Sequence, residues 1–100
     1  MIKKSSVIEI LKEEQPFLRK NFRVKRIAVF GSFAQGTPRK NSDVDIFVEF
    51  DKPIGLEFIR MVEYLEKKLG RDVDVLTPGG LQGIRLKKVA DHIRESLVYV

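Results

Sequence analysis

The sequence predicts an α+β domain with α/β-like features, in which a small mixed β-sheet of about three to four strands is flanked by helices. Segments with the apolar period of a helix alternate along the chain with short strand-length segments rich in valine, isoleucine and phenylalanine. Their order is helix, strand, turn, strand, helix, strand, helix, which favours one sheet with helices on at least one face. No repeat or linker interrupts the 100 residues, so we expect residues 1–100 to form a single domain.

The first helix is expected to begin at the capping box 6–9, where Ser6 and Glu9 have the spacing that caps a helix start. Pro16 is expected to bend or restart this helix, because proline lacks the backbone donor that a helix interior needs. Residues 24–30 are the first predicted strand. Consecutive apolar residues over 27–30 indicate that both of its faces are covered.

The second predicted strand spans residues 44–50, after a turn and a polar loop over 31–41. Because side chains alternate between the two faces of a strand, its residues fall into two sets. One face carries Val44, Ile46 and Val48, and the other carries Asp43, Asp45, Phe47 and Glu49. The second face therefore brings two carboxylates to the start of the strand.

The second half of the chain is predicted to be helix 56–69, strand 71–76 and helix 82–95, followed by an apolar tail. Gly70 is the expected end of the middle helix. The predicted buried residues of the middle helix are Leu56, Ile59, Val62, Leu65 and Leu69, and those of the last helix are Leu86, Val89 and Ile93. Tyr64 is expected on the exposed side of the middle helix.

The charge balance and the cysteine count limit the possible functions. Nineteen basic against 14 acidic residues give a net charge of +5, which favours a polyanionic partner such as a nucleotide, a nucleic acid or an acidic protein, or serves solubility only. The chain has no cysteine, which excludes disulfides, thiolate metal sites and cysteine nucleophiles and fits a reducing compartment. No apolar stretch is long enough to cross a membrane and the start lacks a signal peptide, so we expect a cytoplasmic protein with no membrane partner.

Asp43 and Asp45 are the first candidate metal ligands. Side chains two apart on a strand point the same way, with Cα atoms roughly 6.6 Å apart, and repel unless a cation lies between them. Oxygen ligands of this kind suit Mg²⁺, and such a pair can serve two metals during phosphoryl or nucleotidyl transfer. The alternative is a turn that leads into a strand, with Asp45 facing water. The position of Asp45, inside an apolar strand and close behind a glycine–serine turn, favours the metal site.

The Gly31–Ser32 turn is the candidate nucleotide-binding element. Glycine lets the backbone approach a phosphate closely, backbone amides donate to the anion, and Ser32 adds a hydroxyl donor. The alternative for this pair is an ordinary turn at the end of a strand. Its place between the two predicted strands, shortly before the aspartate pair, favours the functional interpretation.

Asp74 is the candidate for a third carboxylate, which would complete a two-metal site or accept the proton of the attacking hydroxyl. Asp74 lies between Val73 and Val75, inside the third predicted strand, whereas Asp72 lies at the start of that strand beside Arg71. We therefore predict that Asp74 belongs to the site and that Asp72 is a solvated residue.

The segments 31–36 (GSFAQG) and 42–46 (SDVDI) together resemble the signature of the polymerase β-like nucleotidyltransferase superfamily. More narrowly, the chain is similar to the minimal nucleotidyltransferase (MNT) family, the antitoxin half of HEPN–MNT toxin–antitoxin pairs, over nearly its whole length. The resemblance implies the nucleotidyltransferase fold and gives the residues their roles: Gly31 and Ser32 contact the triphosphate, Asp43 and Asp45 carry Mg²⁺, and Asp74 is the third carboxylate. Gln35 departs from the family, which often has arginine there.

The resemblance also implies a function. It predicts a Mg²⁺-dependent enzyme, with two ions, that moves AMP from ATP to a tyrosine hydroxyl of a cognate HEPN ribonuclease toxin and silences it. A hetero-oligomer with the toxin fits this function. The alternative is a non-catalytic binding module that neutralises a partner by covering it, with the apolar tail 97–100 at the interface. Nucleic acid is not expected as a direct substrate, because basic and aromatic residues are not interleaved.

Overall fold

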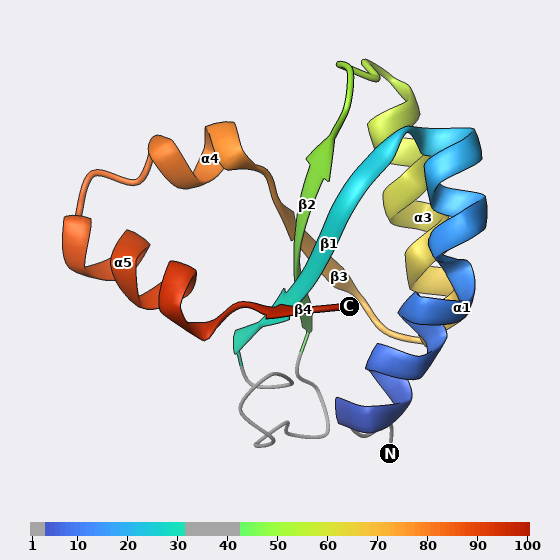
Figure 1. Cartoon of the computed structure of the whole chain (residues 1–100), viewed down its shortest axis with the longest axis horizontal. Helices are drawn as coiled ribbons and strands as arrows, with labels where there is room; N and C mark the ends of the chain where they lie inside the picture. Colours follow the sequence, from blue (N-terminus) through green and yellow to red (C-terminus); the bar gives the residue numbers. More distant parts are fainter. Residues whose placement is uncertain (1–3, 32–42) are drawn as a thin grey trace.

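A four-stranded mixed sheet forms the centre of the computed structural model, which describes residues 4–31 and 43–100 (Figure 1). The strands are β1 (Val24–Phe30), β2 (Val44–Phe50), β3 (Val73–Leu76) and β4 (Val98–Tyr99), in the spatial order β3-β2-β1-β4. β1 pairs antiparallel with both β2 and β4, whereas β2 and β3 are parallel. The predicted small mixed sheet flanked by helices is confirmed.

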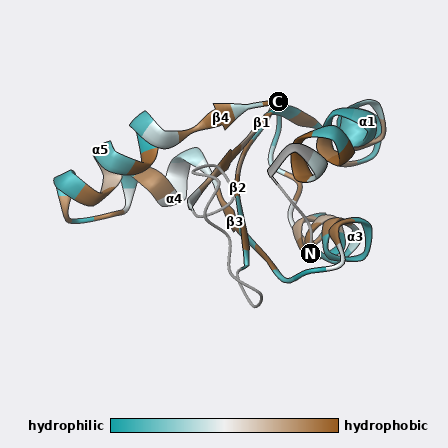
Figure 2. Ribbon diagram, turned by 90° about the horizontal axis from the view of Figure 1, so that it is seen from below, coloured by the Kyte–Doolittle hydropathy of each residue, from teal (hydrophilic) through white to brown (hydrophobic). Residues whose placement is uncertain are grey.

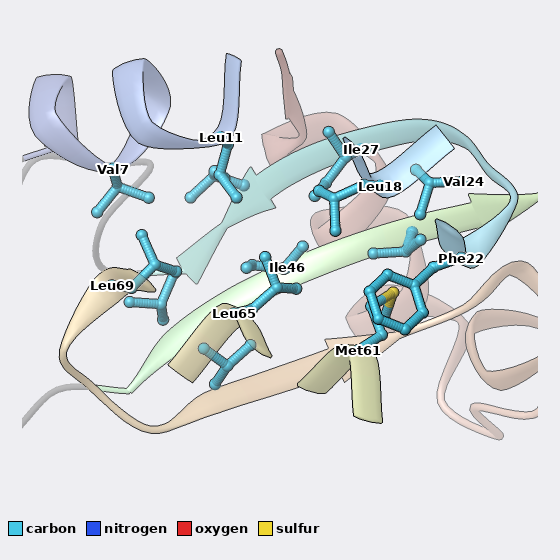
Figure 3. Packing of buried hydrophobic residues seen from close by; sticks show 14 residues of the cluster. Val7, Leu11, Leu18, Phe22, Val24, Ile27, Ile46, Met61, Leu65 and Leu69 are labelled. Atoms are coloured by element: carbon cyan, nitrogen blue, oxygen red, sulfur yellow. The ribbon is translucent and has the colours of Figure 1, made fainter. Parts of the chain in front are cut away.

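Two long helices, α1 (Lys4–Phe22) and α3 (Glu57–Leu69), cover one face of the sheet (Figures 1 and 2). Their apolar side chains point at the strands and enclose the main core (Figure 3). This cluster consists of Val7, Leu11, Leu18 and Phe22 from α1, Met61, Leu65 and Leu69 from α3, and Val24, Ile27, Val29, Val44, Ile46, Val48 and Val73 from the strands. The apolar face of β2 that the alternation predicted is therefore buried here.

Helix α1 passes through Pro16 as one element, so of the two predicted effects of this proline, a bend or a restart, the restart is wrong. Leu11 and Leu18, on either side of the proline, are both fully buried against the sheet. Burial of a leucine side chain contributes about 1.5–3 kcal/mol. Two such anchors offset the cost of about 3 kcal/mol that a proline imposes on a helix interior.

Helix α3 begins and ends close to the predicted residues, and the predicted Leu65 and Leu69 are buried. Leu56 and Ile59, also predicted in the core, are 85% and 57% exposed, so the buried stripe is shorter than predicted. Tyr64, predicted to be exposed, is half-buried and stacks on Phe17 with ring centroids 4.5 Å apart. The contact with α1 thus covers the tyrosine. Gly70 ends the helix as predicted, with a φ of 67°.

The other face of the sheet carries α4 (Pro78–Gln82) and α5 (Lys87–Ser96) instead of the single helix predicted over 82–95. Thr77 begins α4, since its hydroxyl accepts a hydrogen bond of 3.2 Å from the Gly80 amide. Gly83 then ends this short helix. Only a small cluster is buried on this side: Ala28, Phe47, Leu81 and Ala90. Within the described residues, no helix is both long and apolar enough to cross a membrane.

Candidate active site

Asp45 and Asp74 are paired across the two parallel strands β2 and β3. Adjacent strands lie roughly 4.8 Å apart, so this register places the two carboxylates side by side on one face of the sheet. Phe30, the last residue of β1, is the partner of Asp45 on its other side. The three residues therefore meet where β1 ends and where β2 and β3 begin (Figure 1).

Burial and neighbouring carboxylates shape the electrostatic surroundings of Asp45. Its side chain is half-buried, and this burial is the first cause that raises its pKa above the ordinary value. Repulsion from the carboxylate of Asp74 and then from that of Asp43 raises the pKa of Asp45 further. A cation at this position would favour the ionised form of Asp45 and relieve the repulsion.

Gly31 lies directly against the side chain of Asp45. Its φ of 71° is in the left-handed region, which glycine adopts without strain. A Cβ atom on Gly31 would lie 3.0 Å from the Asp45 Cγ and closer still to Oδ2. Gly31 therefore leaves the space that the Asp45 carboxylate occupies. This contact could not be predicted from the sequence, because the contact depends on the pairing of β1 with β2.

Asp43 and Asp72 are both exposed residues that precede a strand. Asp43 precedes β2, is exposed, and is near enough to influence Asp45. Asp72 is exposed before β3, and its backbone carbonyl accepts a hydrogen bond of 3.0 Å from the Val44 amide. Ser32 lies outside the described residues, as do residues 33–42.

The donor set fits Mg²⁺ when a nucleotide supplies further oxygens. Among the described residues, no group of three or more histidine, cysteine, aspartate or glutamate side chains is arranged to hold a metal ion. Mg²⁺ does not need such a group, since it is usually bound through one or two carboxylates together with substrate phosphates and water. Asp45, with its carboxylate neighbours on both strands, offers oxygen ligands of this type.

An open cavity of about 330 Å³ lies further along the same face of β2. Its apolar lining comes from Phe47, Leu81 and Leu97, and its polar lining includes Glu49 and Arg94. Phe47 and Asp45 are two residues apart on β2 and so share this face. The cavity thus begins at Phe47, and neither Asp45 nor Asp74 lines it.

Comparison with known proteins identifies the family. Residues 4–100 match the model of the nucleotidyltransferase domain family. Protein adenylyltransferase MntA of Thermococcus cleftensis is 37% identical over 101 residues, with 100% of this chain and 98% of that protein covered. MJ1379 of Methanocaldococcus jannaschii, provisionally named a protein adenylyltransferase, is 41% identical over 99 residues, with 96% of each chain covered.

Two solved structures are similar to this chain in fold. One that is provisionally described as a minimal nucleotidyltransferase has the same fold, with a TM-score of 0.73 and 24% identity over 97% of this chain and 95% of that one. A toxin–antitoxin crystal structure with AMP-PNP has a TM-score of 0.54 and 26% identity over 83% of this chain and 60% of the other. The chain therefore belongs to the nucleotidyltransferase domain family, on the minimal nucleotidyltransferase branch that its two motifs resemble.

Proposed function

We propose that this nucleotidyltransferase uses Mg²⁺ to move AMP from ATP to a tyrosine hydroxyl of a cognate HEPN-type toxin, and so acts as its antitoxin. The observation that carries the proposal is the pairing of Asp45 with Asp74, in a chain related over its full length to a protein adenylyltransferase. The likeness to a toxin–antitoxin structure with AMP-PNP supports the choice of nucleotide and partner.

Asp43 and Asp45 would hold the metal, at the start of β2. When bound, Mg²⁺ supplies the positive charge that stabilises the triphosphate and the departing pyrophosphate. Gly31 leaves room for the Asp45 carboxylate, and the backbone amides that follow it, together with the Ser32 hydroxyl, would donate to the phosphates.

Asp74 is the proposed general base. Its side chain is exposed, so an acceptor protein that docks on this face has direct access to it. The acceptor oxygen forms a bond to the α-phosphorus of ATP, and the bond from that phosphorus to the oxygen bridging to the β-phosphate breaks. Pyrophosphate leaves with the electron pair of the broken bond. The hydroxyl proton passes to the Asp74 carboxylate and from there to water.

The test is transfer of a labelled AMP group to the purified protein encoded next to this chain's gene, in the presence of ATP and Mg²⁺. We expect mass spectrometry to show a gain of at least one AMP on a tyrosine of the acceptor. Asp74→Asn should reduce turnover by about 100-fold or more, the order expected when a group acting in the transition state is lost. Asp72→Asn is the matched control and should remain close to the wild-type rate.

Two results would contradict the proposal. If Asp72→Asn lost more activity than Asp74→Asn, the assignment of the third carboxylate would be wrong. If the wild-type chain bound and inhibited its neighbour without any AMP transfer, the chain would be a binding module that acts by covering its partner.

A further inference from the structure

Two apolar side chains at the start of α5 are left uncovered. Leu86, the residue before the helix, is 69% exposed, and Val89 is 45% exposed. Ala90, in contrast, is buried against the sheet. Leu86 and Val89 are three residues apart, so they lie on one side of the first turn of α5. Their pattern is that of a buried stripe, which is why the sequence predicted both in the core.

Three cations lie next to this apolar pair in the sequence, and none of them is paired with a described acid. Arg85, Lys87 and Lys88 are all exposed, and residues 78–90 contain neither aspartate nor glutamate. No described carboxylate pairs with any of the three. The first acid of α5, Asp91, is paired with Arg94 at 3.1 Å. The start of α5 therefore exposes apolar and cationic side chains close together in the chain.

These residues are unfavourable for the helix that they begin. The positive end of the helix dipole favours acids in the first turn, yet Lys87 and Lys88 occupy it. Leu86 has the extended backbone of an N-cap residue, with φ −83° and ψ 105°, but offers no capping hydrogen bond. Serine, threonine, aspartate or asparagine is favoured at such a position. Local stability thus does not explain the choice of leucine and lysine here, and local conflicts of this kind are expected at functional sites.

We propose that residues 85–89, hereafter the α5 docking surface, bind the acceptor protein through a region of that protein that combines apolar and acidic side chains. This inference rests on the proposed function, because it names the surface that brings the acceptor to the site. The cations give the charge complementarity that speeds association, and Leu86 and Val89 supply the apolar contact. Nucleic acid would satisfy the cations but would leave the two apolar side chains without a comparable contact.

A second copy of this chain is a poorer occupant of the same surface. A twofold dimer would bring the same surface of each copy together. The three cations close to Leu86 in the chain would then face the same three cations of the other copy, and like charges that meet at an interface are unfavourable. An acidic partner avoids this repulsion.

The α5 docking surface lies on the catalytic side of the sheet. Helix α5 packs through Ala90 in a cluster with Phe47, which shares its face of β2 with Asp45 (Figures 1 and 2). Helices α1 and α3 occupy the opposite face. A protein held by the start of α5 is therefore on the side of the sheet where Asp74 is exposed.

The test uses substitutions that improve the helix while they remove the proposed contacts. Leu86→Ser provides a capping side chain and Lys87→Glu places an acid in the first turn, so both variants should unfold at a temperature equal to or above that of the wild type. The dissociation constant for the purified neighbour-gene product is measured by calorimetry. We expect each variant to weaken binding about tenfold and the double variant to weaken it further. The KM for the acceptor should rise while kcat stays close to the wild-type value.

Matched controls exist on the other side of the sheet. Leu56 is also an exposed N-cap residue without a capping hydrogen bond, at the start of α3, so Leu56→Ser makes the same chemical change away from the α5 docking surface. Lys12→Glu, on the exposed side of α1, makes the same charge change as Lys87→Glu away from the α5 docking surface. Both controls should bind the acceptor within about twofold of the wild type. Wild-type affinity should also fall as salt is added, and that of Lys87→Glu should fall less.

The outcomes separate this inference from the proposed function. If the wild type binds its neighbour but transfers no AMP, the proposed function fails, and the same affinities still decide the docking surface. Equal affinity for the wild type, Leu86→Ser and Lys87→Glu overturns the inference, as does a wild type that does not bind its neighbour. A variant that instead loses RNA binding or self-association, with acceptor affinity unchanged, also overturns it.

Discussion

Asp45 is held in a position that costs the folded protein stability. Burial and two neighbouring carboxylates raise its pKa, so its ionised form is less favourable in the folded chain than in the unfolded one. In the proposed enzyme, a metal-bound nucleotide offsets this cost. The free energy stored in the repulsion between Asp45 and Asp74 therefore favours the loaded state over the empty one.

We predict that Asp45→Asn abolishes AMP transfer and makes the metal-free protein more stable at neutral pH. The physical reason follows from the sign of the shift. Because the folded pKa is raised above 3.8, wild-type stability falls as the pH rises from about this value through the raised pKa. The variant lacks this pH-dependent fall in unfolding free energy. Urea unfolding of both proteins at several pH values measures the difference. A large destabilisation of Asp45→Asn at neutral pH would instead give Asp45 a structural role.

We predict that Gly31→Ala is more damaging than the same change at Gly70. Both glycines have positive φ, 71° and 67°, so alanine carries a similar backbone penalty of about 1–2 kcal/mol at each. A Cβ on Gly70 meets nothing within 4 Å, whereas one on Gly31 collides with the Asp45 carboxylate. Gly31→Ala should therefore cost more in unfolding free energy, and it alone should reduce AMP transfer. Equal activity in the two variants would contradict the proposed link between Gly31 and Asp45.

At the scale of elements, a side-chain contact joins the two long helices. Tyr64 of α3 stacks on Phe17 of α1 and donates a hydrogen bond to Glu14 of α1. Lys68 lies 3.9 Å from the same carboxylate. This contact explains why Tyr64 is half-buried.

We predict that this contact weakens at high pH. The hydrogen bond to Glu14, then burial, then the charge of Glu14 raise the pKa of Tyr64 to about 12. The unfolded chain releases this proton near its ordinary value of 10.0, so the unfolding free energy should fall as the pH rises from there to about 12. Tyr64→Phe should show a smaller fall. Tyrosinate absorbance, compared between the two proteins, measures the pKa, and a titration of Tyr64 near 10 would contradict the prediction.

At the scale of the whole molecule, the two sides of the sheet are unequally packed. The side of α1 and α3 encloses most of the buried apolar residues, whereas the side of α4 and α5 buries only a small cluster around Phe47. Elements with few buried contacts open at lower free energy than the core. The side of α4 and α5, on which the candidate carboxylates Asp45 and Asp74 lie, is therefore expected to open more easily.

We predict that hydrogen exchange separates these two sides. Amides of α5 should exchange faster than those at the centres of α1 and α3, which open only when the whole domain unfolds. Binding of the acceptor protein should slow exchange in α5 and leave α1 unchanged. Uniform exchange rates across the three helices in the free protein would show that the domain opens only as one unit.

Much of the fold could be predicted because it follows from neighbours along the chain. The bounds of the strands 24–30 and 44–50 agree with the structure, since alternation and β-branched residues encode them locally. The burial of Tyr64 could not be predicted, because it depends on a contact with α1, far away in the sequence. The short helix α4 was missed because the proline and the glycine pair at 78–80 predict a break in the chain.

The sequence by itself determined the types of the main elements, the family to which the motifs point and the candidate carboxylates Asp43, Asp45 and Asp74. Only the tertiary structure decided that Asp45 stands beside Asp74, that Gly31 makes room for it and that Leu86 is uncovered. The physical reason is the distance along the sequence between the residues that interact. Periodicity is a local property and indicates only the direction in which a side chain points from its own helix or strand. Pairing between β2 and β3, joined through α3, decides which side chains meet.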